Sequence, residues 1–547
     1  MVDIIVKRIP TEILLQIFHI CKDCQDSAQY LFNLSLVCRL WREVVQGCPT
    51  LWSDIWLDVS SDMPKLERQV KYQLERAGDT LLSLAIEFPS HSARRWTEQE
   101  CAARSVQLAE VVRGSMPRWK LFRMRAYLRE TRLFFDNCVG HTPHLSHITI
   151  ALSDIKFEAG VSRLSIPFQR PVGADSGPPI QASFMSCLPI YPSLGASITS
   201  LEVDVTSIHP HTSDLIAMLL SCPNLVRYHL RGGFGQTIGI ISDPVQVPLP
   251  HLLDLRVSGL RDSVYILGAL RFEGLRSLSI DVFYFPPVLQ DILESIFRSC
   301  TLLTAVNING SMFDRLDAPL LSGFTWQPVV LPSVKQFTFS RANAALLQLF
   351  RQLSLPCAQT LEIHRAPCDV AYHLMSSSAQ LASASFFELV DAPLHHAPIT
   401  TLPNPDTIVI VGSLELLSYI DAPNLCALSL TNTKGYHNIA SNIRSLIERS
   451  TPPLRKLRLI GVHQLTDEDL IWCLRRLPFV EELEIGSSLL SDITLRALAA
   501  PSPPKQGADV GVLLPRLRSA NFWDNYPTPH GLAALAASRS AVAWTYD

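Results

Sequence analysis

A short pattern of apolar positions, apolar-x-x-apolar-x-apolar, recurs through most of this chain. Clear copies begin at Ile198, Leu225, Leu252, Leu275 and Leu303, so successive copies start 27, 27, 23 and 28 residues apart. The last three positions of each copy alternate like the buried face of a strand. A unit that returns about every 20 to 30 residues predicts a solenoid, in which stacked repeats share one core.

Further copies extend the pattern along the chain. They begin at Leu81, Trp119, Leu145, Val334, Leu361, Leu425, Leu454, Val480 and Leu517, with weaker copies at Phe387 and Ile408. Segments with helical spacing, such as 213–222 and 291–300, lie between them. If each repeat is strand, turn, helix and turn, equivalent strands must run parallel with right-handed crossovers. Short alternating helices and strands would also suit a doubly wound α/β enzyme, but the number of copies favours the solenoid.

The first fifty residues carry apolar positions with helical spacing instead. One run places Ile13, Leu14, Ile17, Phe18 and Cys21 on a single face; after a polar loop, a second run does so with Leu36, Val37, Leu40, Trp41, Val44 and Val45. Short helices cannot bury so many large apolar side chains among themselves. We therefore expect another part of the chain, or another protein, to cover part of these faces.

This stretch resembles an F-box. The resemblance rests on Ile9-Pro10-Thr11-Glu12-Ile13-Leu14, Ile17-Phe18, Val37-Cys38, Trp41-Arg42 and Leu51-Trp52, with Ile9 standing where the family pattern has Leu. It implies that a Skp-type adaptor binds a helical face. The residues of that face would be Ile9, Pro10, Leu14, Ile17, Phe18, Val37, Cys38, Trp41, Leu51 and Trp52.

The remainder resembles the irregular leucine-rich-repeat domain that follows F-boxes. We expect an α/β chain with a small all-helical F-box at 5–56, a connecting segment and helix at 57–79, and a solenoid at 80–547. The solenoid would be right-handed and leucine-rich-repeat-like, with a parallel sheet on its concave face. Segments 160–197 and 501–511 contain many Pro, Gly and Ser residues, so we expect inserted loops there. The tail at 531–543 is expected to be a helix that caps the last repeat.

Polar residues between the apolar strand positions should line the concave face. The candidates for binding a target protein are Glu202, Asp204, His229, Arg231, Arg256, Asn307, Asn309, Lys456, Arg458, Glu482 and Glu484. On neighbouring strands, Asp204 would lie beside Arg231, Arg227 beside Asp254, and the pair Lys456 and Arg458 beside Glu482 and Glu484. The pattern fits either internal charge ladders or a mixed-charge surface for a protein partner.

Composition and charge narrow the function classes. A net charge of −3 gives no global attraction to nucleic acid or to an anionic membrane. The start lacks the pattern of a secretory signal, and the long uncharged stretches are interrupted by Pro or polar residues, so we expect no membrane contact and a cytoplasmic or nuclear location. Thirteen scattered cysteines indicate reduced core residues.

Candidate chemical sites are few. Cys21 and Cys24 have the spacing of half a zinc site, and His141, His144 and His147 lie close in sequence, but neither set has further ligands at suitable spacing. The glycine-rich segment 232–239 is not followed by a helical pattern, as a phosphate loop requires. We expect no metal, no cofactor and no catalytic constellation.

The resemblance implies the substrate-recognition subunit of an SCF-type E3 ubiquitin ligase. The F-box would bind the Skp-type adaptor, which links it to the cullin–RING ligase, and the repeats would bind an unknown target protein. An alternative is a leucine-rich-repeat interaction scaffold without a ligase role, whose N-terminal helices only cap the solenoid. An α/β enzyme is the third hypothesis. Burial of the F-box face should distinguish the first two.

Overall fold

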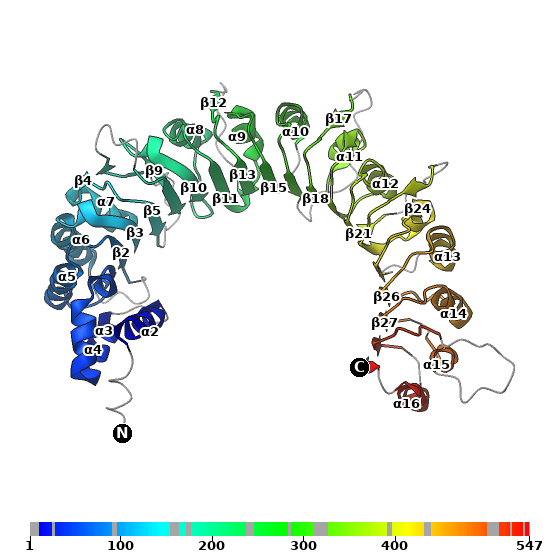
Figure 1. Ribbon diagram of the computed structural model, residues 1–547. Helices are drawn as coiled ribbons and strands as arrows, with labels where there is room; N and C mark the ends of the chain where they lie inside the picture. The colour runs from blue at the N-terminus through cyan, green and yellow to red at the C-terminus, as the bar shows by residue number, and fades with distance from the viewer. Residues whose placement is uncertain are drawn as a thin grey trace. The chain divides into compact units, whose positions relative to one another are not determined.

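The computed structural model describes most of the chain. The described residues are 10–23, 28–89, 96–153, 163–170, 177–236, 245–282, 286–310, 327–390, 397–431, 439–488, 490–499, 513–525, 528–539 and 542–545. They divide into two compact units, residues 1–274 and 275–547, which we describe in turn (Figure 1). Ile9 and the segment 501–511 lie outside the described residues.

Unit 1 begins with helices. These are α2 (Thr11–Asp23), α3 (Ala28–Val37), α4 (Arg39–Gly47) and the short 3-10 helix η1 (Pro49–Trp52). The sequence pattern predicts one helix across 34–45, and this is wrong. The chain breaks at Cys38, whose extended backbone caps α4 and whose sulfur accepts a hydrogen bond from the Trp41 N–H at 3.4 Å. The break separates Leu36 and Val37 from the face formed by Val44 and Val45.

The sheet of unit 1 is parallel throughout. Its strands are β1 (Asp54–Asp58), β2 (Leu82–Glu87), β3 (Trp119–Ala126), β5 (His147–Leu152), β8 (Ile180–Met185), β10 (Ile198–Asp204), β11 (Arg227–Gln236) and β13 (Asp254–Leu260). They pair in this order. The apolar strand positions are buried and the residues between them are more exposed, as in β2 and β5.

Helices and short strands complete the repeats of unit 1. The helices are α5 (Met63–Ala77), α6 (Glu98–Arg113), η3 (Met116–Arg118), α7 (Leu128–Asn137), η4 (Gly195–Ser197), α8 (Thr212–Leu220) and α9 (Ser263–Ala269). The short strands are β4 (Gly140–His141), β6 (Arg163–Ser165), β7 (Phe168–Gln169), β9 (Leu188–Ile190), β12 (Val247–Pro248) and β14 (Leu270–Arg271). They form separate two-stranded ladders, β4 with β7, β6 with β9, and β12 with β14.

The expectation of an inserted loop at 160–197 is corrected by β8. This strand lies between β5 and β10 in the sheet, and Ala182 and Phe184 are buried in it. A segment that contains Pro and Gly residues precedes β8 and obscures the repeat pattern in the sequence. The described part of the segment therefore supplies a repeat to the sheet.

Unit 2 repeats the same architecture. Its parallel strands, in the order in which they pair, are β15 (Ser277–Val282), β16 (Ala305–Gly310), β18 (Gln336–Ser340), β20 (Thr360–His364), β21 (Ser383–Leu389), β23 (Thr407–Gly412), β25 (Ala427–Thr431), β26 (Lys456–Ile460), β27 (Glu482–Gly486), β28 (Ser519–Trp523) and β29 (Ala543–Thr545). The weak sequence copies at Phe387 and Ile408 are thus real strands. The helix expected at 531–543 is present as α16 (Pro529–Ser538), but it ends earlier and β29 follows it.

The helices of unit 2 connect consecutive strands. They are α10 (Pro287–Ser299), α11 (Ala344–Phe350), α12 (Cys368–Ser376), η5 (Glu415–Tyr419), α13 (Ile439–Ser450), α14 (Asp467–Arg475), α15 (Asp492–Leu498) and α16 (Pro529–Ser538). Short strands β17 (Val329–Val330) and β19 (Leu353–Ser354) pair, as do β22 (Thr400–Thr401) and β24 (Ile420–Asp421). In both units the helices cover one face of the sheet and leave the other open (Figure 1).

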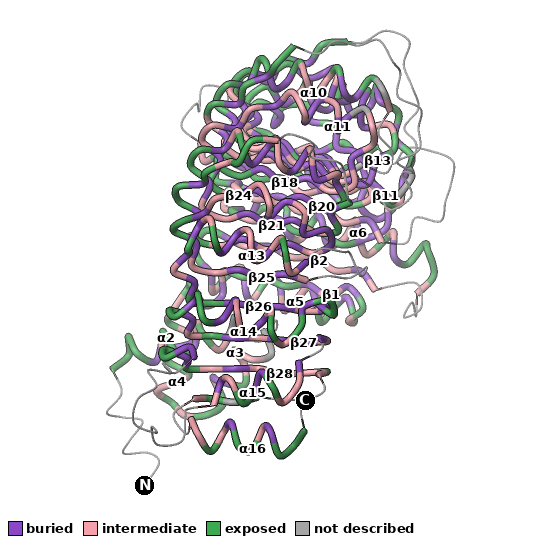
Figure 2. The backbone as a smooth tube through the Cα atoms, turned by 90° about the vertical axis from the view of Figure 1, so that its right-hand side faces the viewer, coloured by how far each residue is buried: buried purple, intermediate pink, exposed green. Residues whose placement is uncertain are grey.

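A bend follows many strands at the same place in the repeat. Directly after the last open-face position, the backbone turns left-handed at Ser186, Arg341, Arg365, Glu388 and Asp524, with φ between 50° and 63°. Glycine adopts this conformation most readily and occupies the equivalent place at Gly259, Gly412 and Gly461, but none of the five positions named above is glycine. Because the side chain at this place varies between repeats, glycine marks the bend in the sequence in only some of them. The N–H groups of Ser186, Arg341 and Arg365 donate to carbonyl oxygens of the next strand at 2.7, 3.0 and 2.9 Å, so stacking of the repeats stabilises the bend. Figure 2 shows buried residues recurring along the stacked turns of the chain.

Parallel strands, helical connections and a shared core define a solenoid of leucine-rich-repeat type, which confirms the predicted fold class. In each unit, buried strand positions of successive repeats form the core. In unit 2, Phe337 and Phe339 are fully buried and both contact Phe350, with ring centroids 5.6 and 4.6 Å away.

Candidate partner-binding surfaces

Four of the ten residues expected to bind an adaptor lie in the core of unit 1. Leu14, Phe18, Leu51 and Trp52 are at most 1% exposed. Phe18 packs edge-on against Trp41, with ring centroids 5.0 Å apart. A buried side chain offers a partner no contact area. These four residues therefore shape and support the helices, and the candidate binding face is smaller than the sequence motif suggests.

Trp52 joins the helices to the first repeat. Its ring lies 5.8 Å from Phe32 of α3 and 5.4 Å from Tyr72 of α5, both edge-on. The indole Nε1–H donates to the Val45 carbonyl oxygen at 2.7 Å. One side of the helical hairpin is thus fixed to the solenoid, as expected of a cap.

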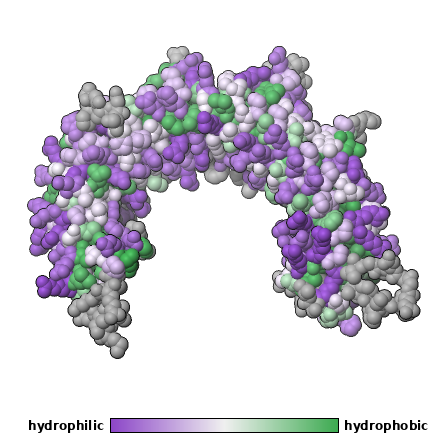
Figure 3. Space-filling model, in the orientation of Figure 1, coloured by the Kyte–Doolittle hydropathy of each residue, from purple (hydrophilic) through white to green (hydrophobic). Residues whose placement is uncertain are grey.

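α2 and the end of α3 also carry exposed apolar residues. Ile13, Ile17 and Ile20 of α2 are 44%, 39% and 65% exposed, and Leu36 and Val37 at the end of α3 are 72% and 59% exposed. We call these five residues the apolar helix surface. Figure 3 shows hydrophobic side chains over α2. Large apolar patches that remain open commonly mark interaction sites.

The remaining adaptor candidates fall between these groups. Pro10 is exposed, whereas Cys38 and Trp41 are half-buried. The F-box motif includes the exposed residues Ile17 and Val37, but it does not include Ile20 and Leu36, which are also exposed. The spacing of Ile13, Ile17 and Ile20 along α2 could have revealed a second apolar face, because residues four and three apart lie on one side of a helix.

On the open sheet face of unit 1, the expected charged residues are brought together. His229 Nδ1 lies 3.5 Å from Glu202 Oε1, and Arg231 Nε lies 4.0 Å from Asp204 Oδ2. The strand register places Arg227 opposite Asp254, as predicted. The carboxylate of Asp254, however, is contacted at 3.3 Å by Arg256 of its own strand.

The open face of unit 2 shows the predicted pairs more clearly. Lys456 Nζ lies 2.8 Å from Glu482 Oε2, and Arg458 Nε lies 3.0 Å from Glu484 Oε2. Asn307 donates to Ser279 Oγ at 3.3 Å. The side chains of all four charged residues are between 30% and 62% exposed, so each pair contributes only about 0 to 1 kcal/mol.

Asn309 and Trp523 extend this polar surface. Asn309 Oδ1 accepts a hydrogen bond from Ser340 at 3.1 Å. The Trp523 indole donates to Glu484 Oε1 at 3.1 Å and lies against Gly486, where an added Cβ would come within 2.2 Å of the ring. Trp523 is not among the predicted residues, because the strand copy beginning at Leu517 is recognisable only by its apolar positions. Charges on this face are therefore largely balanced by neighbours, which confirms the ladder arrangement and leaves a mixed polar surface.

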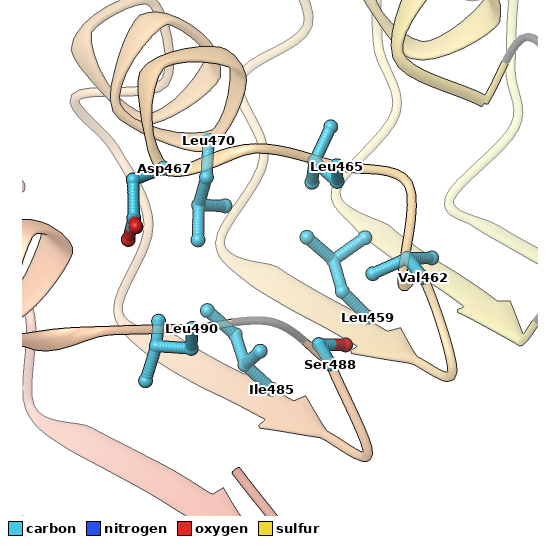
Figure 4. A pocket seen from close by; sticks show the side chains of 8 residues that line it. All are labelled: Leu459, Val462, Leu465, Asp467, Leu470, Ile485, Ser488 and Leu490. Carbon is cyan, nitrogen blue, oxygen red and sulfur yellow. The ribbon is translucent and has the colours of Figure 1, made fainter. Parts of the chain in front are cut away.

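A small cavity lies between two repeats of unit 2. Its lining is mainly aliphatic, with Asp467 and Ser488 as polar members, and the residues are Leu459, Val462, Leu465, Asp467, Leu470, Ile485, Ser488 and Leu490 (Figure 4). The cavity measures about 10 Å³, barely the room for one water molecule. It cannot hold a substrate.

Hydrogen bonds already occupy the carboxylate of Asp467. Ser491 donates to it through its hydroxyl at 2.7 Å and its backbone N–H at 3.3 Å, and Thr494 donates as well. Burial raises the pKa of Asp467, but the hydrogen bonds from Thr494 and Ser491 outweigh this effect and hold the pKa below its usual value. Asp467 is thus an ionised structural group between two repeats.

The cysteine thiols whose pKa burial raises most strongly are not activated. Burial raises the pKa of Cys138, Cys222 and Cys473 to about 12, so these thiols stay protonated near neutral pH. Within the described ranges, no three or more His, Cys, Asp or Glu residues are grouped to hold a metal ion. In the same part of the chain, no helix combines the length and apolar character needed to cross a membrane.

These features define a class: an F-box-like helical domain followed by a leucine-rich-repeat-like solenoid. Residues 6–58 match the sequence profile of the family described as F-box-like. No curated protein has a significantly similar sequence. Among solved structures, a leucine-rich-repeat protein of Leptospira interrogans is similar at 10% identity and a TM-score of 0.34, over 86% of this chain and 91% of that one. The class rests on the F-box-like match and on the repeats themselves.

Proposed function

We propose that this protein is the substrate-recognition subunit of an SCF-type E3 ubiquitin ligase. The observation that carries the proposal is the apolar helix surface, which stays open although α3 and α4 are fixed to the first repeat through Trp52. A Skp-type adaptor would cover this surface together with Pro10. Through the adaptor the chain would reach the cullin–RING ligase.

Burial of apolar side chains would supply the affinity. Covering a large aliphatic side chain is worth about 1.5 to 3 kcal/mol when it passes from full exposure to full burial. The members of the apolar helix surface are already 28% to 61% covered, since their exposed fractions range from 39% to 72%. Their remaining area suits helix docking in an apolar groove, where a few anchors dominate.

The repeats would hold the target protein. Their open faces present polar and balanced charged side chains over many strands, and such surfaces spread recognition over many weak contacts. The role of the chain would then be proximity: it brings a target to a ubiquitin-charged enzyme, and the bond chemistry takes place there. This role places the protein in the cytoplasm or nucleus.

Single charges on the apolar helix surface test the proposal. Ile17→Asp and Leu36→Asp should each abolish co-purification of a Skp-type adaptor, because a buried unpaired carboxylate is costly. Ile493→Asp on α15 is the matched control, since Ile493 is 57% exposed in unit 2. Circular dichroism should show that all three variants fold. Adaptor binding that survives both substitutions would contradict the proposal.

A second candidate is a repeat scaffold without a ligase role. It is favoured by the contacts of Trp52 and Phe32 with Tyr72, because they show that the helices cover the end of the first repeat. The two candidates differ in one measurement. If the folded full chain fails to bind the adaptor at micromolar concentration, the scaffold role is the better explanation.

A further inference from the structure

Five arginines lie at the turns that lead from α14 and its neighbouring helices into the next strands of unit 2. Arg475 is the last residue of α14, and Arg476 follows it as the C-cap. The Glu481 N–H donates to the Arg455 carbonyl at 2.8 Å, and the Arg518 N–H donates to the Glu481 carbonyl at 2.8 Å. These two bonds place Arg455, Glu481 and Arg518 side by side at the start of three successive strands.

Two aromatic residues position arginines at this edge. The Arg476 guanidinium lies 3.8 Å from the ring centroid of Trp472, and that of Arg516 lies 4.9 Å from the ring centroid of Phe479. Phe479 is itself 42% exposed. An arginine resting on a ring is held in place while its N–H groups remain available, because the aromatic face uses none of them as a strong hydrogen bond. We call Arg455, Arg475, Arg476, Arg516 and Arg518 the arginine cluster.

The cluster has few negative neighbours. Within the described residues, Glu481 is the one carboxylate found within 4 Å of any of its members, and it contacts Arg518 at 3.2 Å. Arg455, Arg475, Arg476 and Arg516 are exposed. The positive charge here is therefore not balanced as it is for Lys456 and Arg458 on the open face. Figure 3 shows hydrophilic side chains over α13 and α14.

We propose that the arginine cluster binds an acidic segment of a partner protein, through carboxylate or phosphate groups. Arginine forks pair with both groups through two parallel hydrogen bonds. Resting on the proposed function, the inference assigns this segment to the recruited target. Single-stranded nucleic acid fits less well, since bases need free aromatic faces. Arg444 and Arg476 already lie over Trp472, and Arg516 lies over Phe479.

Binding of labelled peptides to the full chain tests this inference by fluorescence anisotropy. The probes are an oligoglutamate peptide, its oligoglutamine analogue, a phosphoserine peptide of equal charge and an oligothymidine of equal charge. At low salt, at least one acidic peptide should bind and the glutamine analogue should not, with affinity falling as salt rises. The two acidic peptides distinguish carboxylate from phosphate as the preferred group.

Two variants locate the binding. Arg476→Gln with Arg516→Gln should weaken binding of the acidic peptide about tenfold or more, because two charge-assisted contacts are lost. Arg261→Gln with Arg496→Gln removes the same charge from exposed positions elsewhere and should change affinity less than about twofold. Equal losses in both variants, tighter binding of oligothymidine, or no binding of either acidic peptide would each overturn the inference.

The outcome is separable from the ligase role. Arg476→Gln with Arg516→Gln leaves α2 and α3 untouched, so adaptor co-purification reports on the proposed function alone. Arg476→Lys is a further check on mechanism: it keeps the charge but loses the planar fork, so the acidic peptide should bind with intermediate affinity.

Discussion

The N-terminal helices and the repeats use similar apolar residues with opposite results. In unit 2, Ile408 and Ile410 of β23 are fully buried, because neighbouring repeats lie on both sides of the strand. In α2, Ile17 and Ile20 remain 39% and 65% exposed. An apolar pattern therefore predicts burial only where another part of the fold packs against the apolar face.

The junction between the two regions shows where that packing ends. Trp52 and Leu51 are buried against the first repeat, while Leu36 and Val37, only one helix away in sequence, are exposed. Such a step from core to open surface is expected if a second protein completes the packing.

The largest stability effect should come from the repeat core. Phe339→Ala removes a fully buried ring that contacts Phe350, and we expect a loss of about 3 to 5 kcal/mol in the free energy of unfolding, because a cavity remains. Urea unfolding followed by circular dichroism measures this loss. Leu302→Ala, at a position 53% exposed, should change stability by less than about 0.5 kcal/mol.

The junction should respond less strongly to a conservative change. Trp52→Phe keeps the aromatic contacts but removes the indole N–H, so the Val45 carbonyl loses its donor. We expect a loss of about 1 to 3 kcal/mol. Hydrogen exchange should quicken in α4 and η1 and stay unchanged in α14. If exchange in α4 and η1 is as slow in the variant as in the native chain, Trp52 does not join the helices to the solenoid.

A polar contact between repeats should have a smaller, pH-dependent effect. Asp467→Asn replaces a carboxylate that accepts hydrogen bonds from Ser491 and Thr494, and we expect a loss of about 1 kcal/mol at neutral pH. Because the folded pKa lies below the unfolded one, the contribution is present above the unfolded pKa and is lost as pH falls through the folded pKa. The difference in the free energy of unfolding between the native chain and the Asp467→Asn variant should therefore be smaller at acidic pH than at neutral pH. Glu468→Gln, on the exposed side of α14, should show no such change with pH; a difference for Asp467→Asn that persists in acid would contradict the role of Asp467.

The smallest effect should come from the apolar helix surface. Ile17→Ser should change the free energy of unfolding of the isolated chain by less than about 0.5 to 1 kcal/mol, since much of the side chain already faces solvent. Thermal unfolding measures this. A loss as large as that of Phe339→Ala would show that Ile17 belongs to a core, and the comparison between the two regions would fail.

Much of the repeat array could be predicted from the chain because each strand repeats one local rule. The copies at Leu225, Leu252, Leu303 and Leu454 all correspond to strands in parallel register. β8 was missed because Pro and Gly residues obscure its repeat, and the bends after β18 and β20 carry Arg341 and Arg365 with no glycine to mark them. Those features depend on stacking, which a local motif does not contain.

The candidate sites divide in the same way. The ion pairs Lys456–Glu482 and Arg458–Glu484 follow from strand alternation and register. The arginine cluster does not, because Arg476 and Arg516 are brought to one edge by separate turns with 39 intervening residues in sequence. Only the tertiary structure shows which aromatic rings hold them.

The sequence by itself determined the order of the chain: an F-box-like stretch, then parallel strands with alternating buried and polar positions. Those properties follow from local periodicity and need no distant contact to be recognised. Only the tertiary structure decided which apolar side chains of the F-box-like helices stay open. Leu14 and Ile17 are equally apolar, yet one is 1% exposed and the other 39%. The physical reason is that burial depends on what packs against a face, and residues distant in sequence supply that cover.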